Sequence, residues 1–237
     1  MTAGLLIMAA MMGALLLALP GFVSAGGACC AVTKADPGRQ SLALVAASAV
    51  NHETVSGSAY ELSQQAFLLK LGRPLGKGFT LQAQAGLPTA TKLSHQGMEL
   101  SGRGGLIYGA GLGYRLPRFL GSADFHVSAG YTRAAGSLDR DDGISVDREF
   151  RISELQGLLI GEAPLTPLAS AYAGVRAYSG RNQLKDNRTG EKLNGEQEGN
   201  VAGLAGLRYA LTERLSLAAD AGFGHTKVFS LGAALSF

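Results

Sequence analysis

Hydrophobic and polar residues alternate with a period of two over most of the chain after its first forty residues. The pattern is clearest in the final segment, 226–237, where apolar side chains alternate with small or polar ones. The apolar set there is Phe229, Leu231, Ala233, Leu235 and Phe237. Successive side chains of a β-strand point to opposite faces, so this pattern predicts a strand with one apolar face and one wetter face.

Ten segments show this alternation, five of them clearly and five more weakly or at the chain end. The clear segments are 79–87, 106–116, 123–132, 200–211 and 215–223, and the others are 41–50, 60–71, 150–163, 168–178 and 226–237. In 150–163 the alternation slips near Glu154, which we interpret as a β-bulge. An even number of strands brings both chain ends to the same side of a closed barrel. We therefore predict an all-β fold, an antiparallel up-and-down transmembrane β-barrel of about ten strands. Eight strands is the alternative if the first segment and one weak segment do not span.

The connections between these segments alternate between short and long, as in barrels with short periplasmic turns and longer external loops. Unpaired peptide groups cost several kcal/mol in hydrocarbon, so strands cross a bilayer only as a closed ring. A soluble β-sandwich is the alternative, but the second face of these strands carries Gly, Ser, Gln and charges, which would make a poor dry core. We expect any surface ligand at two charged external loops, 133–149 and 180–199, because loops carry most binding functions.

The composition fits one glycine-rich barrel and excludes several other classes. Glycine accounts for 34 of 237 residues, tryptophan is absent, and charged residues make up 16%. This glycine share is about twice the usual value of roughly 7% and suits bent, closely packed strands. The net charge of +3 is scattered along the chain without a basic cluster, so we do not expect nucleic acid as a partner.

The amino-terminal region divides into a leader and a tail that precede the barrel. Residues 5–19 are apolar, and Val23-Ser24-Ala25 forms a small-x-small cleavage pattern, so we predict a signal peptide over 1–25, although no Lys or Arg precedes the apolar run. We assign 26–40 to a periplasmic tail and 41–237 to the barrel. Cys29 and Cys30 are adjacent, which leaves either acylation of Cys29 or free thiols in a mobile tail. Their spacing supports no metal or haem site, and we expect no cofactor.

The carboxy-terminal strand resembles the last strand of bacterial outer-membrane β-barrels, whose final Phe is read by the outer-membrane assembly machinery. We identify Phe229, Leu231, Leu235 and Phe237 as the candidate assembly signal. The resemblance to small barrels of the OmpA or OmpX type covers Ser41 to Phe237. It implies a bacterial outer-membrane location with extracellular long loops and periplasmic termini. The partners it implies are outer-membrane lipids, lipopolysaccharide and the assembly machinery.

Several charged or titratable side chains fall on the face that would line the lumen. They are Arg115, Asp124, His126, Arg176, Arg208 and Asp220. Charges in a barrel interior must pair, so one hypothesis is a salt-bridge network that plugs a narrow lumen. The protein would then be non-enzymatic, with a structural or surface-interaction role through its external loops. The alternative is that the same charges line a narrow, porin-like channel for small solutes, since wider pores need more strands.

Two other motifs suggest chemistry that we consider and set aside. His126-Val127-Ser128 places His and Ser on one face of a strand and is similar to the His-x-Ser arrangement of lipid A 3-O-deacylase barrels, with Glu154 as the nearest candidate acid. That face is the lumen, which a lipid substrate does not reach, so we predict no catalytic residues. A cluster of acidic residues in one loop suggests calcium: Asp139, Asp141, Asp142 and Asp147. Its spacing does not match an EF-hand loop, so we predict no metal site.

Overall fold

The computed structural model describes residues 39–55, 58–96, 98–102, 104–116, 123–140, 147–197, 201–224 and 226–237. Its strands are β1 (Ser41–Val55), β2 (Ser58–Gly76), β3 (Phe79–His95), β4 (Met98–Gly102), β5 (Leu106–Leu116), β6 (Asp124–Arg140), β7 (Arg148–Pro164), β8 (Ala169–Asp186), β9 (Lys192–Gln197), β10 (Val201–Ala210), β11 (Leu215–Gly224) and β12 (Lys227–Ser236). No helix in these ranges is long and apolar enough to cross a bilayer. The predicted signal peptide, Cys29 and Cys30 lie outside the described residues.

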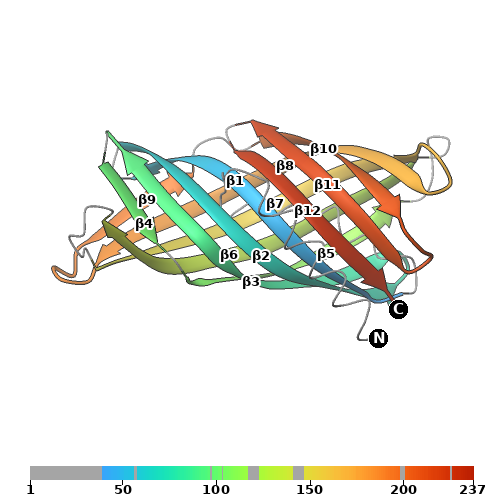
Figure 1. Ribbon diagram of the computed structural model, residues 1–237, viewed down its shortest axis with the longest axis horizontal. Helices are drawn as coiled ribbons and strands as arrows, with labels where there is room; N and C mark the ends of the chain where they lie inside the picture. The colour runs from blue at the N-terminus through green and yellow to red at the C-terminus, as the bar shows by residue number, and fades with distance from the viewer. Residues whose placement is uncertain are drawn as a thin grey trace.

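The strands close into a ring because the last strand pairs with the first. Neighbours around the ring are antiparallel and follow the order β1-β2-β3-β5-β6-β7-β8-β10-β11-β12. The register between β1 and β12 runs from Ser41↔Ser236 to Val50↔Lys227. The two short strands complete the wall: β4 pairs with β3 and β6, and β9 pairs with β8 and β1. The predicted barrel of about ten strands is confirmed, with tilted strands and with the beginning of β1 and the end of β12 at one end of the molecule (Figure 1). We call this the terminal end and the opposite one the far end.

The strands extend farther toward the far end than the sequence pattern predicted. β6 continues to Arg140, β7 begins at Arg148, and β8 continues to Asp186, with paired residues up to Arg148↔Asp186. Most of the described part of the predicted loops 133–149 and 180–199 is therefore strand, and those loop boundaries were wrong. Backbone pairing continues beyond the apolar outer band. There the outer face becomes polar and the inner face carries apolar residues such as Leu138 and Phe150, so the outward-apolar pattern used to recognise the strands ends.

The outer face of the barrel is a belt of exposed apolar side chains. Large exposed residues occur on strands all around the ring, among them Leu69, Leu81, Leu112, Leu159, Val175, Leu207 and Phe223. The aromatic residues Phe79, Tyr108, Tyr131 and Tyr209 are also exposed on this face, as expected of residues at the edges of a lipid-facing band. Apolar surface on this scale is typical of a protein that sits in lipid. Phe229 and Phe237 are exposed as well, whereas Leu231 and Leu235 are half-buried.

The bulge predicted near Glu154 is absent, because β7 pairs with β6 and β8 without a register shift. The sequence pattern misled because β7 is apolar on both faces over part of its length. Phe150 and Ile152 are buried in the interior, whereas Leu155 is exposed on the outer face. The irregularities lie elsewhere, between β2 and β3, where the register shifts between Gln65 and Ala66 and again between Pro74 and Gly76.

Candidate functional site

The barrel interior is the candidate site, and its terminal end is lined by ion pairs. Arg115 on β5 donates to Asp124 on β6 over 2.7 Å. Arg208 on β10 donates to both carboxylate oxygens of Glu162 on β7 over 3.0 Å, and the Ser170 hydroxyl donates to the same carboxylate. Both contacts of Arg208 come from one guanidinium nitrogen, which lies between the two carboxylate oxygens in a charge-assisted hydrogen bond. Ion pairs between side chains of different strands therefore connect the wall at the terminal end of the lumen.

A cavity of about 400 Å³ opens beside these pairs at the terminal end. The charged residues in its lining are Asp124, Glu162, Arg208, Glu213 and Arg214. Hydroxyl groups of Thr166, Thr212 and Ser216 complete a polar wall. Both signs of charge are interspersed, so the cavity favours water and small polar solutes over a ligand of one charge.

A second level of polar contacts lies in the middle of the barrel. Arg176 on β8 forms an ion pair with Glu154 on β7, and the two side chains are only 2% and 1% exposed. The guanidinium also lies over the ring of Tyr178, 4.7 Å from its centroid. This pair is isolated from water, so each charge depends on the other for compensation.

Asp220 on β11 is the centre of the other buried polar cluster. Its carboxylate accepts hydrogen bonds from Ser230 over 2.7 Å and from the Tyr172 hydroxyl over 3.3 Å. The positive charge of the buried Lys70 on β2 also acts on Asp220. Lys70 and Asp220 come from strands that β1 and β12 separate, so their interaction runs through the interior of the barrel.

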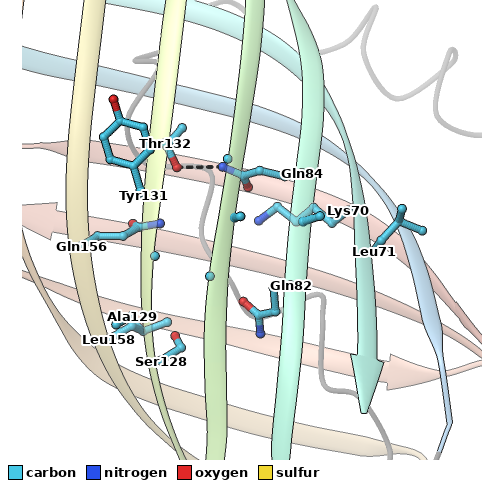
Figure 2. A pocket seen from close by; sticks show the side chains of 15 residues that line it. Lys70, Leu71, Gln82, Gln84, Ser128, Ala129, Tyr131, Thr132, Gln156 and Leu158 are labelled. Carbon is cyan, nitrogen blue, oxygen red and sulfur yellow. Dashed lines mark hydrogen bonds between the residues drawn. The ribbon is translucent and has the colours of Figure 1, made fainter. Parts of the chain in front are cut away.

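A small polar pocket of about 40 Å³ lies against the glycine-rich wall formed by β5 and β6 (Figure 2). Lys70, Gln82, Gln84 and Gln156 line it, and Gln84 donates to the Thr132 hydroxyl over 2.9 Å. The room exists because β5 presents glycines to the interior there. Adding a Cβ at Gly111 would place it 2.7 Å from a backbone oxygen of β6. The pocket has the size and polarity for ordered water rather than for a larger ligand.

The far end of the interior holds a group of buried apolar side chains, beside the buried polar residues Asn51 and Asn182, which the sequence analysis did not predict. We call this the far-end apolar cluster, and it consists of Leu62, Leu93, Leu138, Phe150, Ile152 and Leu184. These residues come from β2, β3, β6, β7 and β8, and Phe150 faces Leu184 in register. Leu138 is 0% exposed and Phe150 is 5% exposed. Side chains that are buried to this degree do not border a water-filled passage.

At the far rim, Asp186 organises the connection between β8 and β9. Its carboxylate accepts hydrogen bonds from the backbone N–H groups of Arg188 and Thr189, over 2.9 and 3.2 Å. The Thr189 and Arg188 amides, together with Arg148, hold the pKa of Asp186 below its ordinary value. The turn is therefore fixed by an ionised carboxylate.

The structure places all six sequence-predicted lumen residues inside the barrel but divides them among separate clusters. Arg115 and Asp124 contact each other, as predicted residues of one network should. Arg208 and Arg176 instead pair with Glu162 and Glu154, which the sequence analysis did not place in the network. Regular alternation through β7 would have identified both glutamates as interior residues. His126 is half-buried beside Arg115 in the register of β5 and β6.

The residues considered for catalysis do not come together. His126 lies opposite Ile160 on β7, whereas Glu154 lies opposite Thr132 and pairs with Arg176. The proposed association of Glu154 with His126 and Ser128 is therefore wrong. Asp147, from the acidic loop, accepts a hydrogen bond from Asn187 over 2.9 Å. In the described ranges no group of His, Cys, Asp and Glu side chains is arranged to hold a metal, and Asp141 and Asp142 lie outside them.

Comparison with known proteins gives the fold and leaves the role open. No protein-family model and no curated protein matches the sequence. The transport unit of the autotransporter AIDA-I from Escherichia coli is similar, with 12% identity, a TM-score of 0.50 and coverage of 90% of this chain and 95% of that one. The NalP translocator domain from Neisseria meningitidis has 15% identity and a TM-score of 0.49, with coverage of 87% of this chain and 91% of that one. Ail from Yersinia pestis has 15% identity and a TM-score of 0.39, with coverage of 84% of this chain and 99% of that one. At these identities the likeness shows the fold alone, which is that of bacterial outer-membrane β-barrels.

Proposed function

We propose that this outer-membrane β-barrel is a non-enzymatic protein with a closed lumen that acts through the surface at its far end. In this proposal the far end is extracellular and both termini are periplasmic. The far-end apolar cluster is the observation that carries the proposal. It packs inside the barrel at the level where these strands leave the apolar outer band, so in this proposal the part of the protein open to a partner is the projecting wall above it.

The burial of the cluster supports a closed lumen on physical grounds. A conducting pore needs a continuous column of water, which leaves the side chains around it partly exposed. Apolar constrictions also expel water, which stops ions even where a narrow gap remains. Leu138 and Phe150 are buried, so they do not line a column of water, and they are apolar, so a narrow gap beside them would exclude water.

The pairing of the interior charges supports the same proposal. Arg176, Arg208 and Arg115 each contact a carboxylate within the interior. A guanidinium held by a carboxylate contributes to rigidity and presents little net charge to a passing ion. The polar interior is thus explained as packing between strands.

Single-channel recording in a planar bilayer tests the closed lumen. We expect the refolded wild-type chain, residues 26–237, to be silent. Replacing two cluster residues by smaller ones, in the Leu138→Ser/Phe150→Ala variant, should produce discrete openings because a wet path replaces the apolar constriction. The matched control is Leu155→Ser/Leu159→Ala, which removes similar side chains from the outer face of the same wall and should remain silent. Steady openings of the wild type would contradict the proposal.

The second candidate is a narrow channel for small solutes, which the cavity of about 400 Å³ at the terminal end favours. Its lining carries charges of both signs, as expected where small polar solutes enter from that side. If this candidate is right, the wild type conducts, and replacing Arg115 and Arg208 by Ala changes its ion selectivity. A silent wild type whose cluster variant conducts excludes a constitutively open channel.

The absence of enzymatic activity is also part of the proposal. His126 and Ser128 face the interior, where an acyl chain of a membrane lipid does not reach them. Incubating the refolded barrel with lipid A should leave its acyl chains intact by mass spectrometry. Loss of an acyl chain that is abolished by Ser128→Ala would overturn this part.

A further inference from the structure

Arginines gather on the outer face of the barrel wall just beyond its apolar band. Arg133 on β6 pairs in register with Ser153 on β7, and Ser153 pairs with Arg181 on β8, so these residues form one row across neighbouring strands. Arg151 lies two positions from Ser153 on the same face of β7. We call this group the Ser153 site: a small hydroxyl residue with arginines on both lateral sides and on its far side.

The spacing of the sheet brings these side chains within reach of one small anion. Neighbouring strands lie about 4.8 Å apart, so Arg133 and Arg181 are separated by roughly 10 Å across Ser153. Ser153 leaves the space between them open because its side chain is short. A guanidinium is planar and presents several N–H donors, which suits the oxygens of a phosphate group.

The charges of the site are only partly neutralised by the protein. Within the described ranges, neither Arg133 nor Arg181 forms an ion pair, and both are at least partly exposed. Arg151 contacts Glu149 over 3.3 Å, and both side chains are exposed to water. Glu196 lies opposite Arg181 in the register of β8 and β9. Positive charge therefore remains available, and an added anion would compete only with exposed carboxylates.

The surface on the near side of Ser153 determines what kind of anion fits. Leu155 is the next residue on this face of β7 and is 62% exposed, with Tyr131 opposite it in register. Farther along the same face, Leu159 pairs with Val175, and both are exposed. An apolar strip thus leads away from the arginines toward the middle of the membrane band. A free anion would not use this strip, whereas a lipid would cover it with an acyl chain.

We propose that the Ser153 site binds the phosphate of a phosphorylated lipid from the surrounding leaflet. The phosphate lies over Ser153 between the guanidinium groups, and an acyl chain follows Leu155 and Leu159. In the orientation proposed above, this leaflet is the outer one, and a lipid A headgroup has the required chemistry. The binding geometry itself does not depend on that orientation or on a closed lumen.

Native mass spectrometry of the refolded barrel in detergent micelles tests the proposal, with diphosphorylated lipid A as the probe. Removing both lateral arginines, in Arg133→Gln/Arg181→Gln, should weaken retention about tenfold or more for each arginine lost, because hydrogen bonds between charged groups are strong. The charge-matched control, Arg73→Gln/Lys92→Gln, removes two exposed cations elsewhere on the outer face and should retain lipid A within about twofold of the wild type. Ser153→Glu places a carboxylate at the centre of the site and should abolish retention.

Two further probes identify the recognised group. Lipid A without its phosphates should not be retained, which would show that the acyl chains alone are insufficient. Phosphatidylglycerol tests whether a glycerophospholipid phosphate is accepted as well, and tighter retention of it than of lipid A would assign the site to that lipid. Equal retention by the wild type, Arg133→Gln/Arg181→Gln and Ser153→Glu would overturn the proposal, as would an equal loss in the charge-matched control. None of these outcomes depends on conductance, so this test and the test of the closed lumen fail separately.

Discussion

The buried ion pair between Glu154 and Arg176 allows a quantitative test of how the interior is stabilised. Both side chains are almost completely buried, so solvent screens their interaction little. Removing one partner from such a pair leaves an uncompensated charge and typically costs about 3–5 kcal/mol. We expect Glu154→Leu and Arg176→Met each to lower the free energy of unfolding by about that amount. The Arg176 variant should be slightly worse, because it also loses the contact with Tyr178.

The double variant Glu154→Leu/Arg176→Met distinguishes the ion pair from general disruption of packing. It buries no unpaired charge, so its loss should be well below the sum of the two single losses, with a coupling energy of at least about 1.5 kcal/mol. Arg115→Met/Asp124→Leu is a useful control, because Arg115 is 26% exposed and its pair should be weaker.

Guanidinium unfolding in detergent micelles, followed by far-ultraviolet circular dichroism, gives these free energies by linear extrapolation. Circular dichroism is preferable to intrinsic fluorescence because the chain has no tryptophan. Single variants that each cost less than about 1 kcal/mol would refute the assignment of a buried, mutually dependent pair. Strict additivity in the double variant would refute it as well.

Three other predictions concern the wall, the far rim and the last residue. Gly111→Ala should lower the yield of folded barrel on refolding, because the added Cβ would lie 2.7 Å from a backbone oxygen of β6. Gly157→Ala is the control and should refold normally, because the atom nearest to its added Cβ is 3.9 Å away. The pKa of Asp186 is lowered, so its hydrogen bonds to the turn persist above about pH 3.8 and are lost as the pH falls through its folded-state pKa. The amide proton shift of Arg188, followed by nuclear magnetic resonance in micelles, should therefore be constant above about pH 4.5. A titration of this shift near neutral pH would contradict the assignment. Phe237→Ala should reduce the fraction of chain assembled in cells and leave refolding in micelles unchanged, because the side chain is exposed; equal defects in both assays would mean a loss of stability instead.

The ring and its strands were predictable from the sequence because lipid imposes a simple rule on the outer face. Every second residue that contacts hydrocarbon must be apolar, and 229–237 and 106–116 follow this rule without exception. The rule ends where the lipid ends. Beyond it, backbone pairing continues strands such as β6 and β8, but their outer face is polar there, so the outward-apolar pattern no longer identifies them.

The interior was less predictable, because each polar side chain there depends on a specific hydrogen-bond or ion-pair partner, whereas the outer residues all contact the same lipid environment. Alternation placed Arg176 and Arg208 inside correctly, but their partners depend on register across strands, which a single sequence does not reveal. Glu154 and Glu162 became identifiable only when β7 proved regular. The far-end apolar cluster was missed for a related reason: Phe150 and Ile152 are apolar residues on the inner face, and the pattern alone cannot distinguish an apolar interior from a shift in register.

The closure of the ring between β1 and β12 places the residue before β1 beside the last residue of the chain. The backbone groups of Gln40 and Phe237 exchange two hydrogen bonds of 2.9 Å. A short peptide linker could therefore join them, and new ends could be opened in the β8–β9 connection at 187–191 without breaking any pair between neighbouring strands of the ring. Because the ring is closed, no strand is first in the finished structure. The order of synthesis alone makes β1 and β12 the pair whose partners are separated for the longest time. In a circularly permuted chain a different pair of neighbouring strands would close the ring last, and the final structure would be the same.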